Sequence, residues 1–110
     1  MPSLLLTSNV RLPADKSAAF LTAASSAVAA GLGKPESYVL TSLQYADQMS
    51  FGGTCGPTCF AYVASIGAIN PDNNNKLCAS LCALVEEHLG VAGDRTYIQF
   101  TDAERSNFGW

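Results

Sequence analysis

The sequence predicts an α/β fold in which two tandem βαβ units form a four-stranded mixed sheet with two helices on one face. The first observation is the order of the segments, because strand, helix and strand patterns follow one another twice along the 110 residues. The second is that the connections are short, and such units are parallel and right-handed. A chain of this length forms one domain, residues 1–110.

The first unit begins with a strand predicted at Ser3–Ser8, which contains a run of three leucines. A helix is predicted over Ala14–Leu32, because apolar side chains recur there on one face at helical spacing. Pro13 suits the start of that helix, and Gly33 suits the residue after its end. After a short turn, Tyr38–Leu43 is predicted as the second strand.

The second unit follows a looser segment, residues 44–58, which is rich in glycine and proline turn signals. Its first strand is predicted at Cys59–Ile66. Asn70 is a favourable N-cap, and the helix predicted over Pro71–Leu89 has proline at its first position. Thr96–Thr101, with alternating side chains, is predicted as the last strand.

Apolar residues on both faces of the predicted strands indicate that the sheet is covered on both sides. Leu4, Leu5 and Leu6 follow one another directly, as do the apolar residues from Phe60 to Ala64. Two helices can cover only one face of such a sheet, and strands of this kind are normally buried on both. We therefore expect copies of the same chain to cover the other face in a homo-oligomer. The small charged fraction, 14%, agrees with this expectation.

Charge and hydropathy exclude several classes of partner. The net charge is −3, and the absence of a Lys/Arg cluster argues against nucleic acid. No run of eighteen apolar residues occurs, so no membrane span is expected. The start of the chain lacks a basic region followed by an apolar stretch. We therefore expect a cytoplasmic protein, whose secretion would need a route without a signal peptide.

The four cysteines allow two interpretations. Cys55 with Cys59, and Cys78 with Cys82, are each spaced C-x3-C, which could indicate a metal site or a redox pair. However, Cys78 and Cys82 fall inside an apolar helical pattern, where thiols are ordinary packing residues. We favour packing and expect no bound metal.

Pro2 is the first candidate for chemistry. If Met1 is removed, Pro2 becomes the N-terminus and carries a free secondary amine, which can act as a base. Partial burial and a nearby cation both disfavour the protonated amine and lower its pKa toward neutrality. The strand predicted directly after Pro2 would hold this amine inside the fold.

Across its whole length the chain resembles the macrophage migration inhibitory factor family of the tautomerase superfamily. The segments that carry the resemblance are Met1-Pro2, Gly33-Lys34-Pro35, Met49 with Phe51-Gly52-Gly53, Ser65-Ile66-Gly67, Asp94-Arg95 with Tyr97-Ile98, and Gly109-Trp110. The resemblance implies a homotrimer whose sheets surround a central channel. It also implies cofactor-independent tautomerisation of small aromatic keto and enol acids of the phenylpyruvate type, or of dopachrome.

The resemblance also implies roles for individual residues. Pro2 matches the catalytic base. Lys34 matches a lysine that depresses the pKa of that amine and binds the substrate carboxylate. Ile66, with Ser65 beside it, matches a position whose backbone N–H contacts substrate. Without the resemblance, Lys34 would be interpreted as a solvated turn residue and Ser65-Ile66 as a strand end.

Four further residues complete the implied pocket. Tyr97 matches a tyrosine that a neighbouring subunit contributes, although packing at an interface would explain it equally. Tyr38 and Phe108 match apolar walls, with an aromatic core as the alternative. Gln99 stands where the family has a substrate-facing asparagine, so a different substrate preference is expected. The family's short segment after Gly-Trp is not present after Trp110, and we expect a changed pocket mouth and trimer stability.

Receptor binding remains open as an alternative function. The family includes secreted cytokines, so the protein could bind a cell-surface receptor and retain only a vestigial pocket. Arg11 and Asp47 lie near the positions used for receptor contact, with the alignment displaced by one residue at each. The thiol-disulfide activity of some members is not expected, because Thr58 and Ala61 occupy the positions of their redox cysteines.

Overall fold

The computed structural model describes all 110 residues and contains four strands and two long helices. The elements, in chain order, are β1 (Ser3–Ser8), α1 (Ala14–Leu32), η1 (Glu36–Tyr38), β2 (Leu40–Tyr45), β3 (Cys59–Ser65), α2 (Pro71–Leu89), η2 (Gly93–Arg95), β4 (Thr96–Asp102) and η3 (Arg105–Asn107), where η denotes a short 3-10 helix. The predicted boundaries of both long helices are confirmed. No helix is sufficiently long and apolar to cross a membrane.

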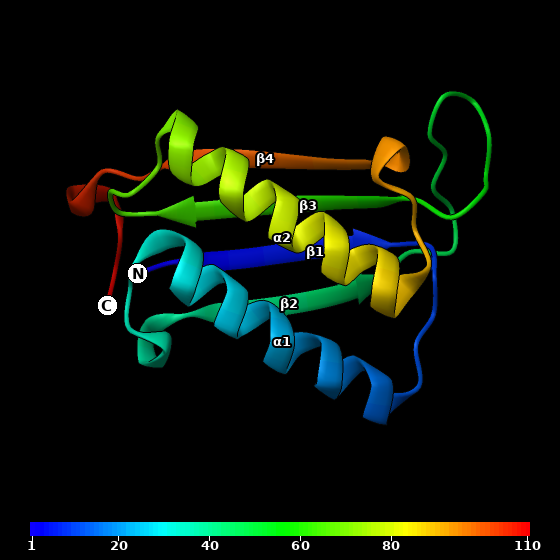
Figure 1. The fold of residues 1–110 in the computed structure, drawn as a ribbon, viewed down its shortest axis with the longest axis horizontal. Helices are drawn as coiled ribbons and strands as arrows, with labels where there is room; N and C mark the ends of the chain where they lie inside the picture. The colour runs from blue at the N-terminus through cyan, green and yellow to red at the C-terminus, as the bar shows by residue number, and fades with distance from the viewer.

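The four strands form one sheet in the order β2-β1-β3-β4 (Figure 1). β1 is parallel to β2, β3 is parallel to β4, and β1 is antiparallel to β3. Each parallel pair is joined through a helix, so the two tandem βαβ units and the mixed sheet are confirmed. The antiparallel contact between β1 and β3 joins the two units into one sheet.

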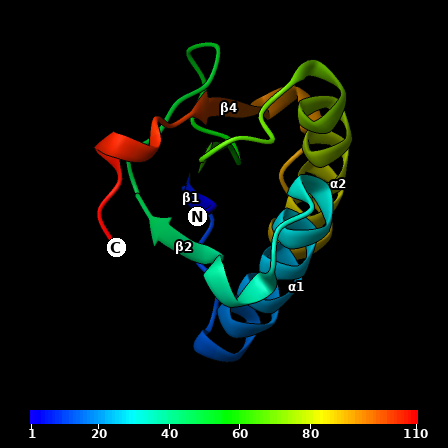
Figure 2. The same ribbon diagram turned by 90° about the vertical axis from the view of Figure 1, so that its left-hand side faces the viewer.

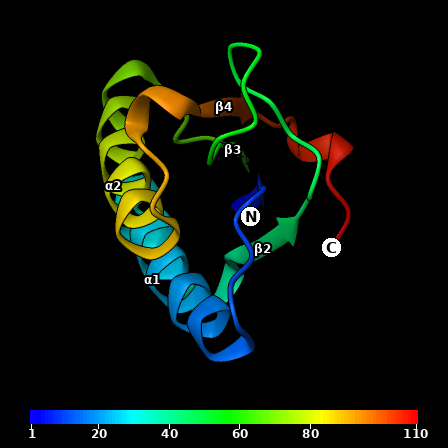
Figure 3. The same cartoon turned by 90° about the vertical axis from the view of Figure 1, so that its right-hand side faces the viewer.

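Both helices lie on the same face of the sheet (Figures 2 and 3). The core between the two layers contains leucines of β1, small residues of β3, and the inward stripe of each helix, namely Leu4, Leu6, Phe20, Ala24, Val28, Ala61, Val63, Leu77, Leu81 and Val85. Gly31 allows α1 to approach α2 closely, because a Cβ atom there would lie 3.0 Å from Leu77 Cδ1.

The predicted start of the second strand at Tyr38 is wrong, because β2 begins at Leu40. Pro35 has φ −61° and starts a tight turn, in which the Tyr38 N–H donates to the Pro35 carbonyl and the Val39 N–H to the Glu36 carbonyl. These bonds close η1 and delay the strand. β2 then extends to Tyr45 beside Ser8 of β1. The third strand ends one residue earlier than predicted and the fourth one residue later, because Ser65 pairs with Asp102.

The other sheet face is open in the single subunit and carries large apolar side chains. Their exposed fractions are 46% for Leu5, 56% for Leu40, 40% for Phe60 and 67% for Tyr97. The neighbours of Leu5 along β1, Leu4 and Leu6, are buried under the helices. This alternation explains the run of leucines, because its central member points to the face that the helices leave open.

The loop between β2 and β3 is held by Arg95, at the end of the sheet remote from the chain termini (Figure 1). The Arg95 guanidinium donates to the Pro57 carbonyl at 2.7 Å and to the Thr54 hydroxyl at 2.8 Å. It also reaches the carbonyls of Phe51, Thr54 and Gly56 at 3.1 to 3.3 Å. One side chain therefore binds four carbonyls and one hydroxyl of this loop.

We expect Arg95→Ala to lower the free energy of unfolding by about 1–3 kcal/mol, because it leaves several carbonyls without a donor. Arg95→Lys retains the charge but lacks the planar guanidinium with its several N–H donors. Most of the decrease in the free energy of unfolding should therefore remain. Urea unfolding would measure both variants. An unchanged midpoint in Arg95→Ala would show that the loop does not depend on these bonds.

Candidate active site

Strand direction brings most of the implied site residues to one end of the sheet. β1 and β2 start at this end, whereas β3 and β4 finish there, because the two pairs are antiparallel to each other. The segments that precede β1 and β2, and those that follow β3 and β4, are therefore neighbours. They contain the N-terminus, Lys34 with η1, Ile66, and η3 with the chain end. Both termini lie at this end in Figure 1.

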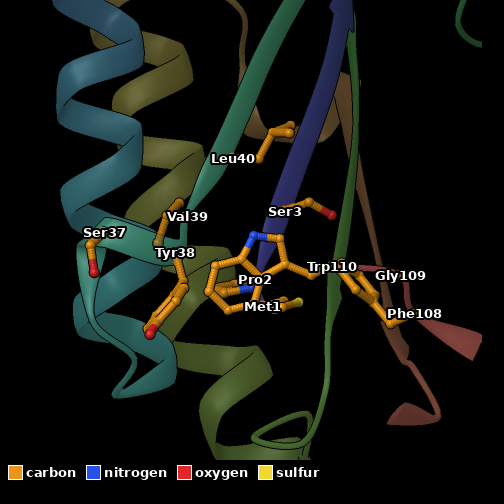
Figure 4. Close-up of a pocket in the computed structure, with 10 residues that line it drawn as sticks. All are labelled: Met1, Pro2, Ser3, Ser37, Tyr38, Val39, Leu40, Phe108, Gly109 and Trp110. Carbon is orange, nitrogen blue, oxygen red and sulfur yellow. The ribbon is translucent and has the colours of Figure 1, made fainter. Parts of the chain in front are cut away.

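Two adjoining cavities meet at Met1. The larger, of about 330 Å³, is mostly apolar and is lined by Met1, Pro2, Ser3, Ser37, Tyr38, Val39, Leu40, Phe108, Gly109 and Trp110 (Figure 4). The smaller, of about 230 Å³, is more polar and is lined by Met1, Lys34, Ile66, Arg105, Phe108 and Trp110. The two cavities together offer an apolar compartment beside a cationic one.

Pro2 lines the apolar cavity and is fixed there by the sheet. Its side chain is fully buried, and its carbonyl accepts a hydrogen bond of 3.0 Å from the Leu40 N–H. The N-terminal amine that precedes it has a lowered pKa, chiefly because burial disfavours its charge, and further because Lys34 and Arg105 are positive. The strand thus holds the Pro2 side chain inside the fold, whereas Met1, which bears the amine in this structure, is only partly buried.

Lys34 is positioned by the turn that ends α1. Gly33 adopts a left-handed conformation with φ 63°, and its N–H caps the helix on the Ala29 carbonyl. The chain then reverses, and the Lys34 Nζ donates to the Ile66 carbonyl at 3.1 Å. This bond joins the segment after α1 to the segment after β3. It leaves the remaining ammonium hydrogens of Lys34 free for a ligand.

The apolar compartment has aromatic walls. Tyr38 and Trp110 contact each other edge to face, with ring centroids 5.2 Å apart (Figure 4). Phe108 and Trp110 line both cavities, as Met1 does. Walls of this kind suit a flat apolar substituent, while a carboxylate would lie toward Lys34.

The structure thus brings together five of the implied residues within one subunit: Pro2, Lys34, Tyr38, Ile66 and Phe108. Ser65 lines neither cavity. Its side chain is fully buried, and its hydroxyl has no hydrogen-bond partner.

Tyr97 and Gln99 lie away from Pro2 in the same subunit. The register places Thr7 opposite Phe60 and Phe60 beside Tyr97. Tyr97 is therefore in the same row as Thr7, five residues along β1 from Pro2, or about 17 Å at the usual rise per residue. Gln99 is in the row of Leu5, which is offset from Pro2 by about 10 Å along the strand direction, and β3 lies between β1 and β4. Both are exposed on the open face, where only another subunit could bring them to a Pro2 amine.

Arg105 is a site residue that the sequence did not suggest. It lies in η3, between β4 and the chain end, and lines the cationic cavity with Lys34. A single charged residue in a short loop belongs to no sequence pattern that would separate a site residue from an ordinary solvent-exposed one. Only the strand order could have indicated that Arg105 belongs to the site, because the segment after β4 lies at the same end of the sheet as the start of β1.

The cysteines lie apart from both cavities. All four are free thiols, and no group of three or more His, Cys, Asp or Glu side chains is arranged to hold a metal ion. Burial raises the pKa of Cys59 to about 12, with a smaller contribution from Cys82. Burial also raises the pKa of Cys82, beside Cys78. Cys59 is buried and Cys78 and Cys82 are partly buried, which agrees with packing, whereas Cys55 is exposed and is not a packing residue.

Comparisons with known proteins agree on one family. The family model described as "Macrophage migration inhibitory factor (MIF)" matches residues 1–110. A macrophage migration inhibitory factor homolog of Trichuris trichiura is 35% identical over 100% of this chain and 96% of that protein. Among solved structures, macrophage migration inhibitory factor of Toxoplasma gondii superimposes with a TM-score of 0.95 at 39% identity, over 98% of this chain and 95% of that one. The homologue from Prochlorococcus marinus gives a TM-score of 0.92 at 38% identity, over 98% and 94%.

Proposed function

The chain belongs to the macrophage migration inhibitory factor family, and from this premise we propose that it is a cofactor-independent keto–enol tautomerase. Its substrate is a small 2-oxo acid with an apolar substituent, of the phenylpyruvate type. The observation that carries the proposal is the position of the N-terminus, where the Met1 amine has a lowered pKa and Met1 lines both an apolar and a cationic cavity.

The proposed mechanism begins with removal of Met1, which places the amine on Pro2. Lys34 holds the substrate carboxylate, and the apolar substituent lies between the aromatic walls. The neutral amine takes a proton from the carbon next to the carbonyl. The electron pair of that C–H bond forms the carbon–carbon double bond, and the carbonyl oxygen receives a proton. The reverse sequence gives ketonisation, and nothing is consumed in either direction.

We further propose that the working enzyme is a homotrimer in which the site is shared between subunits. The open sheet face with exposed Leu5, Leu40, Phe60 and Tyr97 supports this, because it is too apolar for a surface in water. Tyr97 and Gln99 would then enter the Pro2 site of a neighbour. A shared site makes the activity depend on assembly.

The direct test is ketonisation of enol-phenylpyruvate, followed by absorbance on protein whose mass confirms that Met1 is absent. We expect turnover well above the rate in buffer. No turnover by correctly processed trimer would overturn the proposal and favour the receptor-binding alternative. A sample that retains Met1 is the matched control, because its Pro2 nitrogen is an amide.

The pH dependence of kcat/KM should shift when Lys34 is neutralised. Burial and the positive charges of Lys34 and Arg105 lower the pKa of the Met1 amine. We expect the same causes to act on the Pro2 amine once Met1 is removed, so that its neutral, basic form persists to lower pH. Lys34→Gln removes one of these charges and raises that pKa. We therefore expect the ascending limb of the profile to move to higher pH, together with a KM increase of about tenfold from the lost carboxylate contact.

The control for this shift is Lys16→Gln, which removes the same charge from an exposed position on α1. It should leave both the profile and KM unchanged. If the pH at which kcat/KM rises is unchanged in Lys34→Gln, a group other than the N-terminal amine controls the pH dependence.

A further inference from the structure

The three arginines of the chain differ in what their side chains contact. Arg95 is fully engaged with the loop before β3. Arg11 stacks over the Tyr45 ring, with its Cζ 4.3 Å from the ring centroid. Arg105 has no hydrogen bond, ion pair or aromatic partner for its guanidinium, although it lines the cationic cavity. An arginine left free at a cavity is available to bind an anion.

The cationic cavity contains two positive charges and no carboxylate side chain. Lys34 and Arg105 both line it, and none of its other lining residues is acidic. No Lys or Arg side chain lies within 4.0 Å of a carboxylate oxygen, and the one His–carboxylate contact, His88 with Glu87 at 3.9 Å, lies on α2. Neither cation of the cavity therefore forms an ion pair within the subunit. A ligand with one carboxylate would neutralise only one of them.

We propose that the cavity selects ligands with two neighbouring carboxylates, one held by Lys34 and the other by Arg105. The inference rests on the proposed function and names the preferred substrates as 2-oxo dicarboxylic acids and their enols. Lys34 provides a point charge, whereas the planar fork of Arg105 can bind a carboxylate with two parallel hydrogen bonds. An apolar substituent would still enter the larger cavity, which shares Met1 and Phe108 with the cationic one.

Two unreactive ligands with the same phenyl ring test this preference without any turnover. Phenylacetate has one carboxylate, and phenylmalonate has a second one on the same carbon. Isothermal titration with each ligand, on trimer lacking Met1, should show that phenylmalonate binds about tenfold more tightly or better, as expected for one additional charged contact. Equal affinities, or no binding of either ligand, would overturn the proposal.

Substitution of Arg105 assigns the preference to this residue. Arg105→Gln should weaken phenylmalonate binding about tenfold and leave phenylacetate within about twofold. Arg105→Lys, which retains the charge without the fork, should recover part of the loss. Lys16→Gln should bind both ligands as the unsubstituted protein does. If Arg105→Gln weakens both ligands equally, Arg105 binds the same carboxylate as Lys34 and the proposed selectivity is wrong.

The two hypotheses can fail separately. Ketonisation of enol-phenylpyruvate tests the tautomerase, whereas the titrations test ligand charge alone. Turnover with equal binding of the two ligands would retain the tautomerase and reject the dicarboxylate preference. Selective phenylmalonate binding without turnover would retain the double-anion site and reject the catalytic proposal.

Discussion

Inserting one alanine between Met1 and Pro2 is expected to lower kcat/KM for enol-phenylpyruvate by roughly 10²–10⁴-fold, the usual contribution of a general base. The insertion converts the Pro2 nitrogen into an amide, which cannot accept a proton. The Pro2 carbonyl still accepts the hydrogen bond from the Leu40 N–H, so the start of β1 remains paired. The loss therefore reports on the amine rather than on the fold.

Pro2→Gly is the matched substitution at the same position. It retains an N-terminal amine but removes the ring that fixes its direction, so we expect an intermediate loss of about tenfold or more. Thermal unfolding and sedimentation of both variants should match those of the unsubstituted protein. Full activity in the alanine insertion would exclude Pro2 as the base, whatever Pro2→Gly does.

Much of the fold could be predicted because local and tertiary preferences agree in this chain. Both helices begin at a proline that suits the first turn and end at a left-handed glycine, so their boundaries were correct to the residue. The start of β2 was not predictable in this way. Tyr38 and Val39 favour a strand, but the hydrogen bonds that begin at Pro35 close a 3-10 turn first.

The candidate site was predictable only in part. Pro2, Lys34 and Ile66 came from a family resemblance, and strand direction explains why they meet. Arg105 was missed, since nothing in the local sequence separates a pocket arginine from a solvated one. The positions of Tyr97 and Gln99 relative to Pro2 follow from the strand register, which a single sequence does not reveal.

Leu5→Asp is expected to dissociate the proposed trimer and abolish tautomerase activity. Leu5 lies in the middle of the open face and is opposite Tyr62 of β3 in the antiparallel register. Burial of one leucine contributes about 1.5–3 kcal/mol, and a buried unpaired carboxylate costs several kcal/mol more. Symmetry repeats this penalty in every subunit. Sedimentation should then show single 11.5-kDa chains.

The control is Ala19→Asp, which adds the same charge to an exposed position of α1. It should leave assembly and activity intact, because that helix face does not border the open side of the sheet. A Leu5→Asp protein that stays trimeric would place the subunit interface elsewhere. A dissociated protein with full activity would show that one subunit holds a complete site.

Mixing two impaired variants tests the shared site most directly. Pro2→Gly damages the base, and Tyr97→Ala removes the side chain that we assign to the neighbour's pocket. If each site combines Pro2 of one chain with Tyr97 of the next, random co-assembly of equal amounts restores about a quarter of the sites. If both residues served the same chain, no intact site could form. The roughly 17 Å between their rows within a subunit makes the first outcome the expected one.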